Sequence, residues 1–223
     1  MTQILVADDH PLFRDALRRA VQTAVPQAEV RGADSVQALF DLIEACPQAD
    51  LLLLDLHMPG AHGYSALAHI RGQYPGLPII VVSVHEEAGV ARRALAHGAS
   101  AYIPKSAAGA DIVAAIRAVL AGDVWMPRSL LGVQAGLDPD ETAAAARVAS
   151  LTPQQFRVMT MISSGQLNKQ IAYELGVSEA TVKAHMTAIM RKLGVTNRTQ
   201  VALTARVLAI DQDALPALLH TPE

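Results

Sequence analysis

Five short aliphatic runs alternate with helical patterns between residues 3 and 121, and this alternation constrains the fold more than any other feature. Two of the runs, Leu51–Leu54 and Ile79–Val82, are apolar throughout, as is typical of strands buried on both faces. Strands that alternate with helices form βαβ units, so we predict an α/β doubly wound, five-stranded parallel sheet. We predict strands at 4–7, 29–33, 51–54, 79–83 and 101–103, with helices at 12–24, 35–45, 63–73, 86–97 and 109–121.

The pattern changes after residue 121, where glycine and proline recur and an acidic, alanine-rich stretch follows. This composition predicts a linker at 122–148, with a short helix at 140–147. Beyond it the periodicity is only helical, which predicts a small all-α domain at 149–210. We expect helices at 153–164, 168–175, 179–193 and 197–209, followed by an acidic tail at 211–223.

The net charge of −3 is unevenly distributed. Residues 151–210 hold seven basic and two acidic side chains, whereas residues 1–122 hold nine basic and twelve acidic ones. A basic segment in an acidic protein indicates a polyanionic partner for that segment, although a solvated basic face would look the same.

The compartment is predicted from what the sequence lacks. No basic, apolar leader precedes Asp8, and no apolar run is long enough to cross a bilayer. The single cysteine, Cys46, cannot form an internal disulfide and fits a reducing environment. We therefore expect a cytoplasmic protein without a membrane partner.

Polar side chains follow four of the predicted strands. Asp8 and Asp9 follow the first strand, Asp55 ends the third, Ser83 ends the fourth and Lys105 follows the fifth. Each alone has an ordinary explanation, such as a helix cap, a turn or a solvated strand end. Because ligand sites in open parallel sheets lie beyond the carboxyl ends of the strands, the four together predict a shared pocket.

This set of residues suits phosphoryl transfer to a carboxylate. Crowded carboxylates repel one another, and a hard divalent cation such as Mg²⁺ relieves the repulsion. The cation would also neutralise charge on an incoming phosphoryl group. Lys105 supplies a second cation, and the Ser83 hydroxyl supplies a hydrogen-bond donor.

Residues 3 to about 121 resemble the receiver domain of two-component response regulators, which has a flavodoxin-like fold. The resemblance rests on Asp8-Asp9, on Asp55-Leu-His-Met-Pro-Gly, and on Ser83 and Lys105. It implies a receiver domain at 1–121 in which a sensor histidine kinase phosphorylates Asp55. Asp9, Asp55 and the His57 backbone carbonyl would bind Mg²⁺, with Asp8 assisting through water. Ser83 and Tyr102 would be a switch pair that moves inward with phosphate, unless Tyr102 simply packs on a helix.

One position departs from the receiver pattern, because Pro104 stands where the family more often has an aliphatic residue. Its fixed φ could alter the loop that presents Lys105. Near the same pocket, His57 and His85 each lie two residues beyond a strand end. We expect this pair either to position or to block the water that hydrolyses the phosphoryl group.

The C-terminal segment has helix-turn-helix spacing. Leu175-Gly176-Val177 separates two predicted helices, and Ser178 is placed to cap the second. A solvated surface face is the usual explanation of an amphipathic helix. This one, however, opposes its apolar stripe with small and basic residues that can enter a major groove, namely Lys183, Ala184, Thr187 and Arg191.

Residues 149–210 resemble the LuxR/NarL-type DNA-binding domain, through Asn168-Lys169-Gln170-Ile171-Ala172, the Ser178 to His185 stretch and Lys192-Leu193-Gly194. The resemblance implies that helix 179–193 reads double-stranded DNA, with Lys183, Ala184 and Thr187 facing bases. It also implies phosphate contacts from Lys169, Thr181, Lys192 and Arg198. The last helix, with Val201, Ala205 and Leu208 on one side, resembles the family's dimerisation helix, so a homodimer on DNA is expected.

The resulting prediction is a phosphorylation-controlled DNA-binding regulator and not an enzyme. A phosphohydrolase would need an acid two residues after the nucleophile, and that position is His57. A nucleotide-binding enzyme would need a glycine-rich loop after the first strand, which is missing. An unphosphorylated adaptor is disfavoured by the complete pocket.

Because residues 1–150 are acidic and the DNA-binding segment is basic, we expect them to hold the recognition helix electrostatically.

Overall fold

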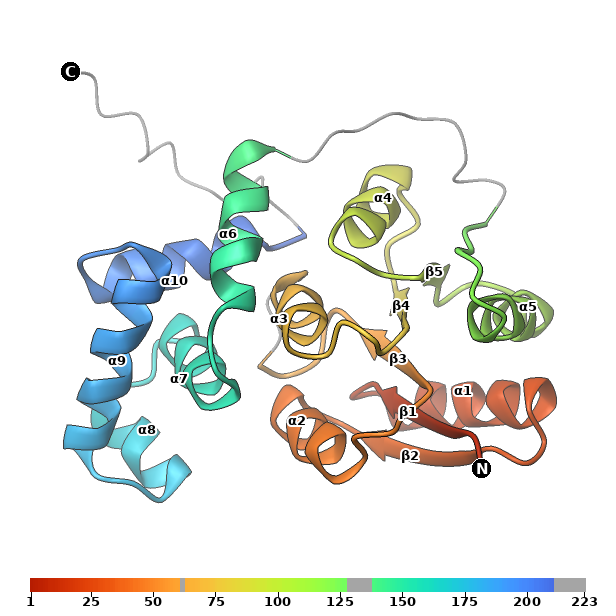
Figure 1. Cartoon of the computed structure of the whole chain (residues 1–223), viewed down its shortest axis with the longest axis horizontal. Coiled ribbons are helices and arrows are strands. Elements are labelled where there is room, and N and C mark those ends of the chain that lie inside the picture. The colour runs from red at the N-terminus through yellow and green to blue at the C-terminus, as the bar shows by residue number, and fades with distance from the viewer. Residues whose placement is uncertain (61–62, 128–137, 211–223) are drawn as a thin grey trace.

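The computed structural model describes residues 1–60, 63–127 and 138–210 (Figure 1). Its N-terminal half is a parallel sheet of five strands in the order β2-β1-β3-β4-β5. This order confirms the doubly wound sheet that the alternation predicts. The strands are β1 (Gln3–Ala7), β2 (Glu29–Ala33), β3 (Leu51–Asp55), β4 (Ile79–Ser83) and β5 (Ala101–Pro104).

Helices cover both faces of the sheet because the strands are apolar on both sides. Within β3, Leu52 and Leu54 face one core while Leu51 and Leu53 face the other. Helices α1 and α5 pack together over the second core, and α2, α3 and α4 lie over the first (Figure 1). These helices are α1 (Pro11–Ala24), α2 (Val36–Ala45), α3 (Ser65–Gln73), α4 (Ala88–Ala96) and α5 (Gly109–Leu120).

The remaining helices of the described chain form a second bundle, as the helical periodicity predicts. They are α6 (Pro139–Ala149), α7 (Pro153–Ser163), α8 (Asn168–Leu175), α9 (Glu179–Leu193) and α10 (Arg198–Val207). Thr152 begins α7 with a reciprocal pair of hydrogen bonds to Gln155, and Pro153 follows it at the first helical position. Residues 128–137 of the expected linker and the expected tail at 211–223 lie outside the described residues.

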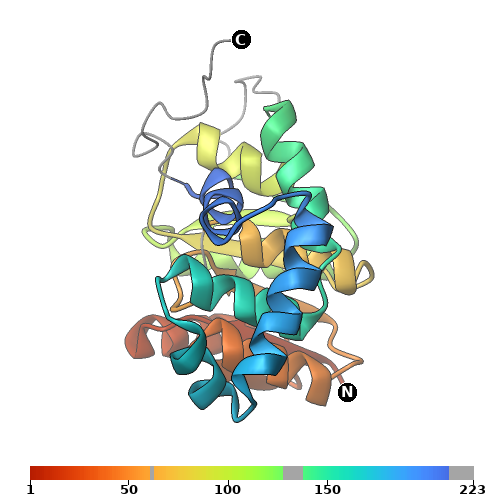
Figure 2. The ribbon, with the colours of Figure 1, turned by 90° about the vertical axis from the view of Figure 1, so that its left-hand side faces the viewer.

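The turn between α8 and α9 has the expected chemistry. Gly176 ends α8 with φ +65°, a left-handed conformation that glycine adopts without steric cost. Ser178 then begins α9, and its hydroxyl accepts a hydrogen bond from the Thr181 amide at 3.1 Å. The two helices pack against each other and present α9 on the side of the bundle remote from the sheet (Figures 1 and 2).

The two halves of the molecule share one hydrophobic core. Helix α6, which arises from the segment predicted as linker, packs along α3 of the sheet domain (Figure 1). The buried cluster that contains Phe40 of α2 also contains Val148 of α6 and Phe156 of α7. In the described ranges, no helix is both long and apolar enough to span a lipid bilayer.

Candidate functional site

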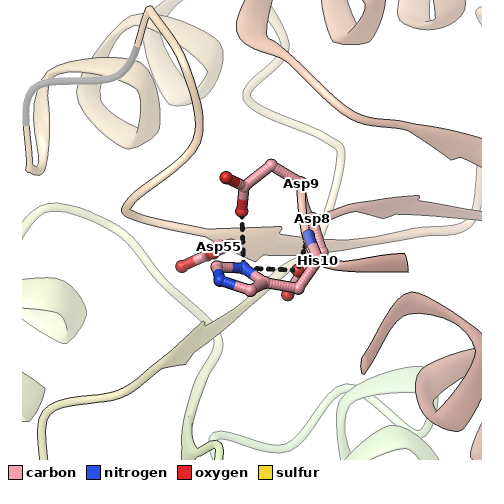
Figure 3. A group of neighbouring side chains, drawn as sticks. All are labelled: Asp8, Asp9, His10 and Asp55. Carbon is pink, nitrogen blue, oxygen red and sulfur yellow. Dashed lines mark hydrogen bonds and ion pairs between the residues drawn. The ribbon is translucent and has the colours of Figure 1, made fainter. Parts of the chain in front are cut away.

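Three acidic side chains converge at the carboxyl ends of β1 and β3, as the strand-end pattern predicts (Figure 3). One ligand atom from each of Asp8, Asp9, His10 and Asp55 lies within 4.8 Å of the others. The carboxylates of Asp8 and Asp55 are fully buried, whereas that of Asp9 is 29% exposed. Asp8 folds back on the loop, because its Oδ1 accepts the His10 amide at 2.8 Å. The cap position of α1 is taken by His10, and no side-chain cap bond forms there.

Lys105 joins this group from the end of β5. Its Nζ lies 2.8 Å from Asp55 Oδ2 and 2.8 Å from Asp8 Oδ2, and it stands over the Phe13 ring. Pro104 does not displace it. Pro104 pairs with Ser83 in the sheet, and the Lys105 amide donates to the Ser83 carbonyl at 2.6 Å, so the missing proline N–H is not needed.

The carboxylate of Asp55 is kept ionised by its neighbours. Burial acts to raise the pKa of Asp55, but the hydrogen bonds from His57 and Lys105 outweigh it and lower the pKa. Burial likewise acts to lower the pKa of Lys105, and its pairing with Asp55 and Asp8 raises that pKa instead. The pocket therefore contains a partly buried ammonium between two buried carboxylates.

The donor set fits a hard divalent cation. Asp8 Oδ2 and Asp9 Oδ1 are buried and accept no hydrogen bond from the described residues, although they form ion pairs with Lys105 and His10. Carboxylate oxygens with free lone pairs are the ligands that Mg²⁺ prefers. The backbone amide of His57 donates to Asp55 Oδ1 at 3.0 Å, which places residue 57 beside the cluster.

His10 is a neighbour of this pocket that the sequence analysis missed. Its Nδ1 lies 2.7 Å from Asp9 Oδ1 and 3.5 Å from Asp8 Oδ1, and its side chain is 64% exposed. Its position directly after Asp8-Asp9 was the available signal. Because Mg²⁺ favours oxygen over imidazole nitrogen, His10 is better suited to pair with the acids than to coordinate the ion.

The two side chains expected to act as a switch are both buried. The Ser83 hydroxyl accepts the His85 amide at 3.3 Å, and the Tyr102 hydroxyl donates to the His85 carbonyl at 2.7 Å. Tyr102 is therefore fully buried in this structure, and its movement with phosphate stays a prediction. Burial raises the pKa of Tyr102 to about 12, so the phenol keeps its proton at neutral pH.

His57 and His85 meet at the mouth of the pocket. Their Nε2 atoms are 3.3 Å apart and their ring centroids 5.0 Å apart. His57 Nδ1 lies 3.8 Å from Asp55 Oδ1. The two imidazoles thus contact each other, and His57 lies beside the Asp55 carboxylate.

The residues expected to contact DNA fall into two groups. The exposed group lies on α8 and α9 and consists of Lys169, Thr181, Lys183, Ala184 and Thr187. The other two side chains are partly buried and engaged within the bundle. Lys192 Nζ donates to the Ser150 carbonyl at 2.8 Å, and the Arg198 guanidinium donates to Asn168 and to the Gln166 carbonyl.

The side of α10 that resembles a dimerisation face is not free in this structure. Val201, Ala205 and Leu208 are fully buried, and they belong to the core that α10 shares with α6, α7 and α9. These residues stabilise the monomer, so a dimer surface on α10 would have to use its other side.

Two family models match the chain. The family described as response regulator receiver domain matches residues 4–117. The family described as bacterial regulatory proteins, luxR family, matches residues 149–205. The two matches fall on the sheet domain and on the helical bundle described above.

Similar proteins cover nearly the whole chain. The glycerol metabolism activator of Pseudomonas putida is 37% identical over 210 residues, which cover 92% of this chain and 95% of the relative. The nitrate/nitrite response regulator protein NarL of Escherichia coli K12 is 32% identical over 203 residues, covering 90% and 93%. RcsB from Salmonella enterica serovar Typhimurium, solved on a promoter, shares the fold with a TM-score of 0.55 and 24% identity, covering 93% and 99%.

The order of the elements, the pocket at the strand ends, the helix-turn-helix and these matches agree with one another. The chain therefore belongs to the NarL-type response regulators, in which a receiver domain is joined to a LuxR-family DNA-binding domain, and it is a transcriptional regulator and not an enzyme.

Proposed function

We propose that a sensor histidine kinase phosphorylates Asp55 and that the modified protein, as a homodimer in the cytoplasm, binds a two-fold DNA site. The observation that carries this proposal is the partly buried contact between Lys105 Nζ and Asp55 Oδ2 at 2.8 Å. It places a fixed cation beside an ionised carboxylate at the end of a buried strand. We assign residues 1–121 to the receiver, 122–148 to the linker and 149–210 to the DNA-binding domain.

Each residue of the pocket has its own role in the proposed phosphoryl transfer. The Asp55 carboxylate attacks phosphorus, a P–O bond forms, and the P–N bond to the kinase histidine breaks. Lys105 pairs with one phosphoryl oxygen, and the Ser83 hydroxyl can donate to another. Asp9, Asp55 and the His57 carbonyl would hold Mg²⁺ directly, and Asp8 would hold it through water. When bound, Mg²⁺ neutralises negative charge on the phosphoryl group.

The exposed residues of α9 support the DNA-binding part of the proposal. Lys183, Ala184 and Thr187 lie on one open face, and Lys169 is exposed on the neighbouring helix. We propose that Lys183, Ala184 and Thr187 face base edges, while Lys169 and Thr181 contact phosphates. Lys192 and Arg198 can add phosphate contacts only by giving up bonds inside the bundle. RcsB, which has the same fold, has been solved as dimers on DNA.

The phosphorylation site is tested with Mg²⁺ and acetyl phosphate as the donor. The full-length protein should gain one base-labile phosphoryl group, measured by mass spectrometry. Asp55→Asn should gain none, and Asp123→Asn, which changes an exposed aspartate, should label as the wild type does. Equal labelling of wild type and Asp55→Asn would overturn the assignment.

A further inference from the structure

Two histidine side chains from neighbouring strand ends contact each other through the same ring atom. His57 is the second residue after β3 and His85 the second after β4, and these two strands pair in parallel. Their Nε2 atoms lie 3.3 Å apart. The side chains are 38% and 20% exposed, so an ion from solvent can reach them. The proposed Mg²⁺ site uses only the backbone carbonyl of His57, which leaves both Nε2 atoms without an assigned role.

The other ring nitrogen of each histidine faces a carboxylate. His85 Nδ1 lies 3.4 Å from Glu87 Oε2, and His57 Nδ1 lies 3.8 Å from Asp55 Oδ1. A carboxylate beside Nδ1 favours the tautomer that carries its proton on Nδ1 and leaves a lone pair on Nε2. Two such lone pairs that face each other repel. The contacts therefore favour a cation between the two Nε2 atoms.

A direct hydrogen bond between the two rings explains this arrangement less well. One neutral ring would have to carry its proton on Nε2, and its Nδ1 would then present a lone pair to a carboxylate. An extra proton shared by the rings would draw the nitrogens to about 2.7–2.9 Å, as in other charge-assisted hydrogen bonds. The separation of 3.3 Å is longer than that.

The separation fits two ligands of one tetrahedral metal ion. Zn²⁺ binds imidazole nitrogen at about 2.0–2.1 Å, so two ligands at the tetrahedral angle lie about 3.3 Å apart. The ring centres of His57 and His85 are 5.0 Å apart, farther than the nitrogens, so the rings converge towards their Nε2 atoms. Both the distance and the direction of the rings therefore suit a shared ion.

This pair of nitrogens selects a different kind of metal from the acidic cluster beside it. Imidazole suits Zn²⁺, Cu²⁺ and Ni²⁺, whereas carboxylate and carbonyl oxygens suit Mg²⁺. The cluster of Asp8, Asp9 and Asp55 offers oxygens, and the histidine pair offers nitrogens. Excess Mg²⁺ should therefore not displace an ion held by His57 and His85.

The backbone holds both imidazoles in place before any ion binds. The His57 amide donates to Asp55 Oδ1 at 3.0 Å, and the His85 amide donates to the Ser83 hydroxyl at 3.3 Å. The His85 carbonyl accepts the Tyr102 hydroxyl at 2.7 Å. Ligands that start from fixed positions lose little conformational freedom on binding, which favours affinity.

We propose that His57 and His85 bind a divalent transition metal, preferably Zn²⁺, through their Nε2 atoms, with water completing the coordination. We call this pair the imidazole site. Glu87 and Asp55 accept from the Nδ1 atoms and orient the rings, as carboxylates do for histidine ligands of metals. The bound ion ties the segment after β3 to the segment after β4. Because His85 is bonded to both switch side chains, this tie should slow phosphorylation of Asp55, a part that rests on the proposed function.

The site is tested with untagged full-length protein in excess Mg²⁺, by competition for Zn²⁺ with a chromophoric indicator. His57→Ala and His85→Ala should each weaken Zn²⁺ binding on the order of 100-fold, and Glu87→Gln by about 10-fold. Glu86→Gln is the matched control, because the Glu86 carboxylate is bonded to the Ser106 hydroxyl and should leave the affinity unchanged. Circular dichroism checks that each variant is folded.

Nuclear magnetic resonance of the imidazole nitrogens identifies the ligand atoms. On addition of Zn²⁺ the Nε2 resonances of His57 and His85 should shift, while each Nδ1 keeps its proton and His185 is unaffected. A wild type that binds no Zn²⁺, or undiminished binding in both histidine variants, would overturn the site. Binding that survives in His57→Ala but is lost in Asp9→Asn would place the ion in the acidic cluster and overturn it as well.

The effect on phosphorylation is measured separately. With Mg²⁺ and acetyl phosphate, added Zn²⁺ should slow labelling of Asp55 in the wild type and leave the labelling rate of His85→Ala unchanged. Comparing each protein with and without Zn²⁺ cancels any direct effect of the substitution. Equal slowing in both proteins would overturn the link to Asp55 while the imidazole site stands. If Asp55 takes up no phosphate, the proposed function fails, and the binding measurements still decide whether the imidazole site exists.

Discussion

The imidazole of His69 in the receiver lies face to face with the phenyl ring of Phe156 in the DNA-binding domain, with ring centroids 4.4 Å apart and planes at 17°. The Phe40 ring meets both of them edge-on, at 5.2 and 5.4 Å. His69 Nδ1 also faces the Val148 carbonyl at 3.3 Å. A titratable ring therefore lies in the middle of the contact between the two domains.

Acid should weaken this contact through His69. Burial lowers the pKa of His69 from 6.5 to about 4, although the Val148 carbonyl acts to raise it. The unfolded chain therefore binds a proton that the folded chain does not, between about pH 6.5 and pH 4. The free energy of unfolding should fall as the pH drops through this window, by up to about 1.4 kcal/mol per pH unit from this residue. Urea unfolding at several pH values measures the free energy of unfolding as a function of pH. In His69→Phe this free energy should fall less steeply between pH 6.5 and pH 4, because the contribution of His69 is gone.

The aromatic contact itself should be a large part of the stability. Phe156 is fully buried, so Phe156→Ala should lower the free energy of unfolding by about 3–5 kcal/mol, because it leaves a cavity between the domains. Tyr173→Ala removes an aromatic ring that is 90% exposed and should change stability by less than about 0.5 kcal/mol. Chemical denaturation measures both, and similar losses would contradict the interface described here.

The exposed residues of the DNA-binding domain should differ in what they contribute. Lys169→Ala should weaken binding about equally on all sequences. It should also reduce the slope of log affinity against log salt concentration by about one unit. Thr187→Ala should change which sequence is preferred. Fluorescence anisotropy on varied duplexes at several salt concentrations distinguishes the two. Thr199→Ala, on an exposed position of α10, is the control, and identical behaviour of all three variants would refute the assignment.

The paired imidazoles of His57 and His85 should prolong the life of the phosphoryl group. Because the two rings contact each other beside Asp55, we expect them to shield the phosphoryl group from water together, and removing either one should speed hydrolysis. His57→Ala and His85→Ala should therefore lose phosphate faster than wild type, and by similar factors. Radiolabel decay from Asp55 measures the rates, with His185→Ala as a control outside the receiver. Unchanged decay in both pocket variants would mean that neither histidine affects the rate of phosphate hydrolysis.

The fold could be predicted closely because local patterns determine most of it. The strand 79–83 and the helices 168–175 and 179–193 have the bounds that periodicity, Gly176 and Ser178 indicate. The helix predicted at 63–73 begins only at Ser65, and the one predicted at 86–97 runs from Ala88 to Ala96. Helix ends depend on capping contacts that periodicity does not register.

The pocket was predictable for a similar reason, because parallel strands bring their carboxyl ends to one edge. That rule placed Asp8, Asp55 and Lys105 together without any knowledge of distances. The rule does not single out His10, whose signal in the sequence is its position directly after Asp8 and Asp9. Nor could it show that Arg198 is held by Asn168, since that contact joins residues 30 positions apart.

The contact between the domains was the least predictable feature. Glu141 looks like an ordinary acid in a charged, alanine-rich linker, and its burial depends on Arg93 and His97, which are far away in sequence. Net charge suggested electrostatic attraction to the recognition helix. The structure instead uses apolar packing and one buried pair, because both depend on which surfaces meet after each domain has folded.

The core that Phe40, Val148 and Phe156 share across the two domains has a consequence for how the protein melts. Domains joined only by a flexible tether unfold in separate transitions, whereas domains that share buried side chains unfold together. The protein with packed domains should therefore give a single calorimetric peak whose van't Hoff and calorimetric enthalpies agree. Once the domains part, each keeps only its own share of the core, and the peak should split in two. The heat capacity curve therefore distinguishes packed from separated domains, and the measurement needs no DNA.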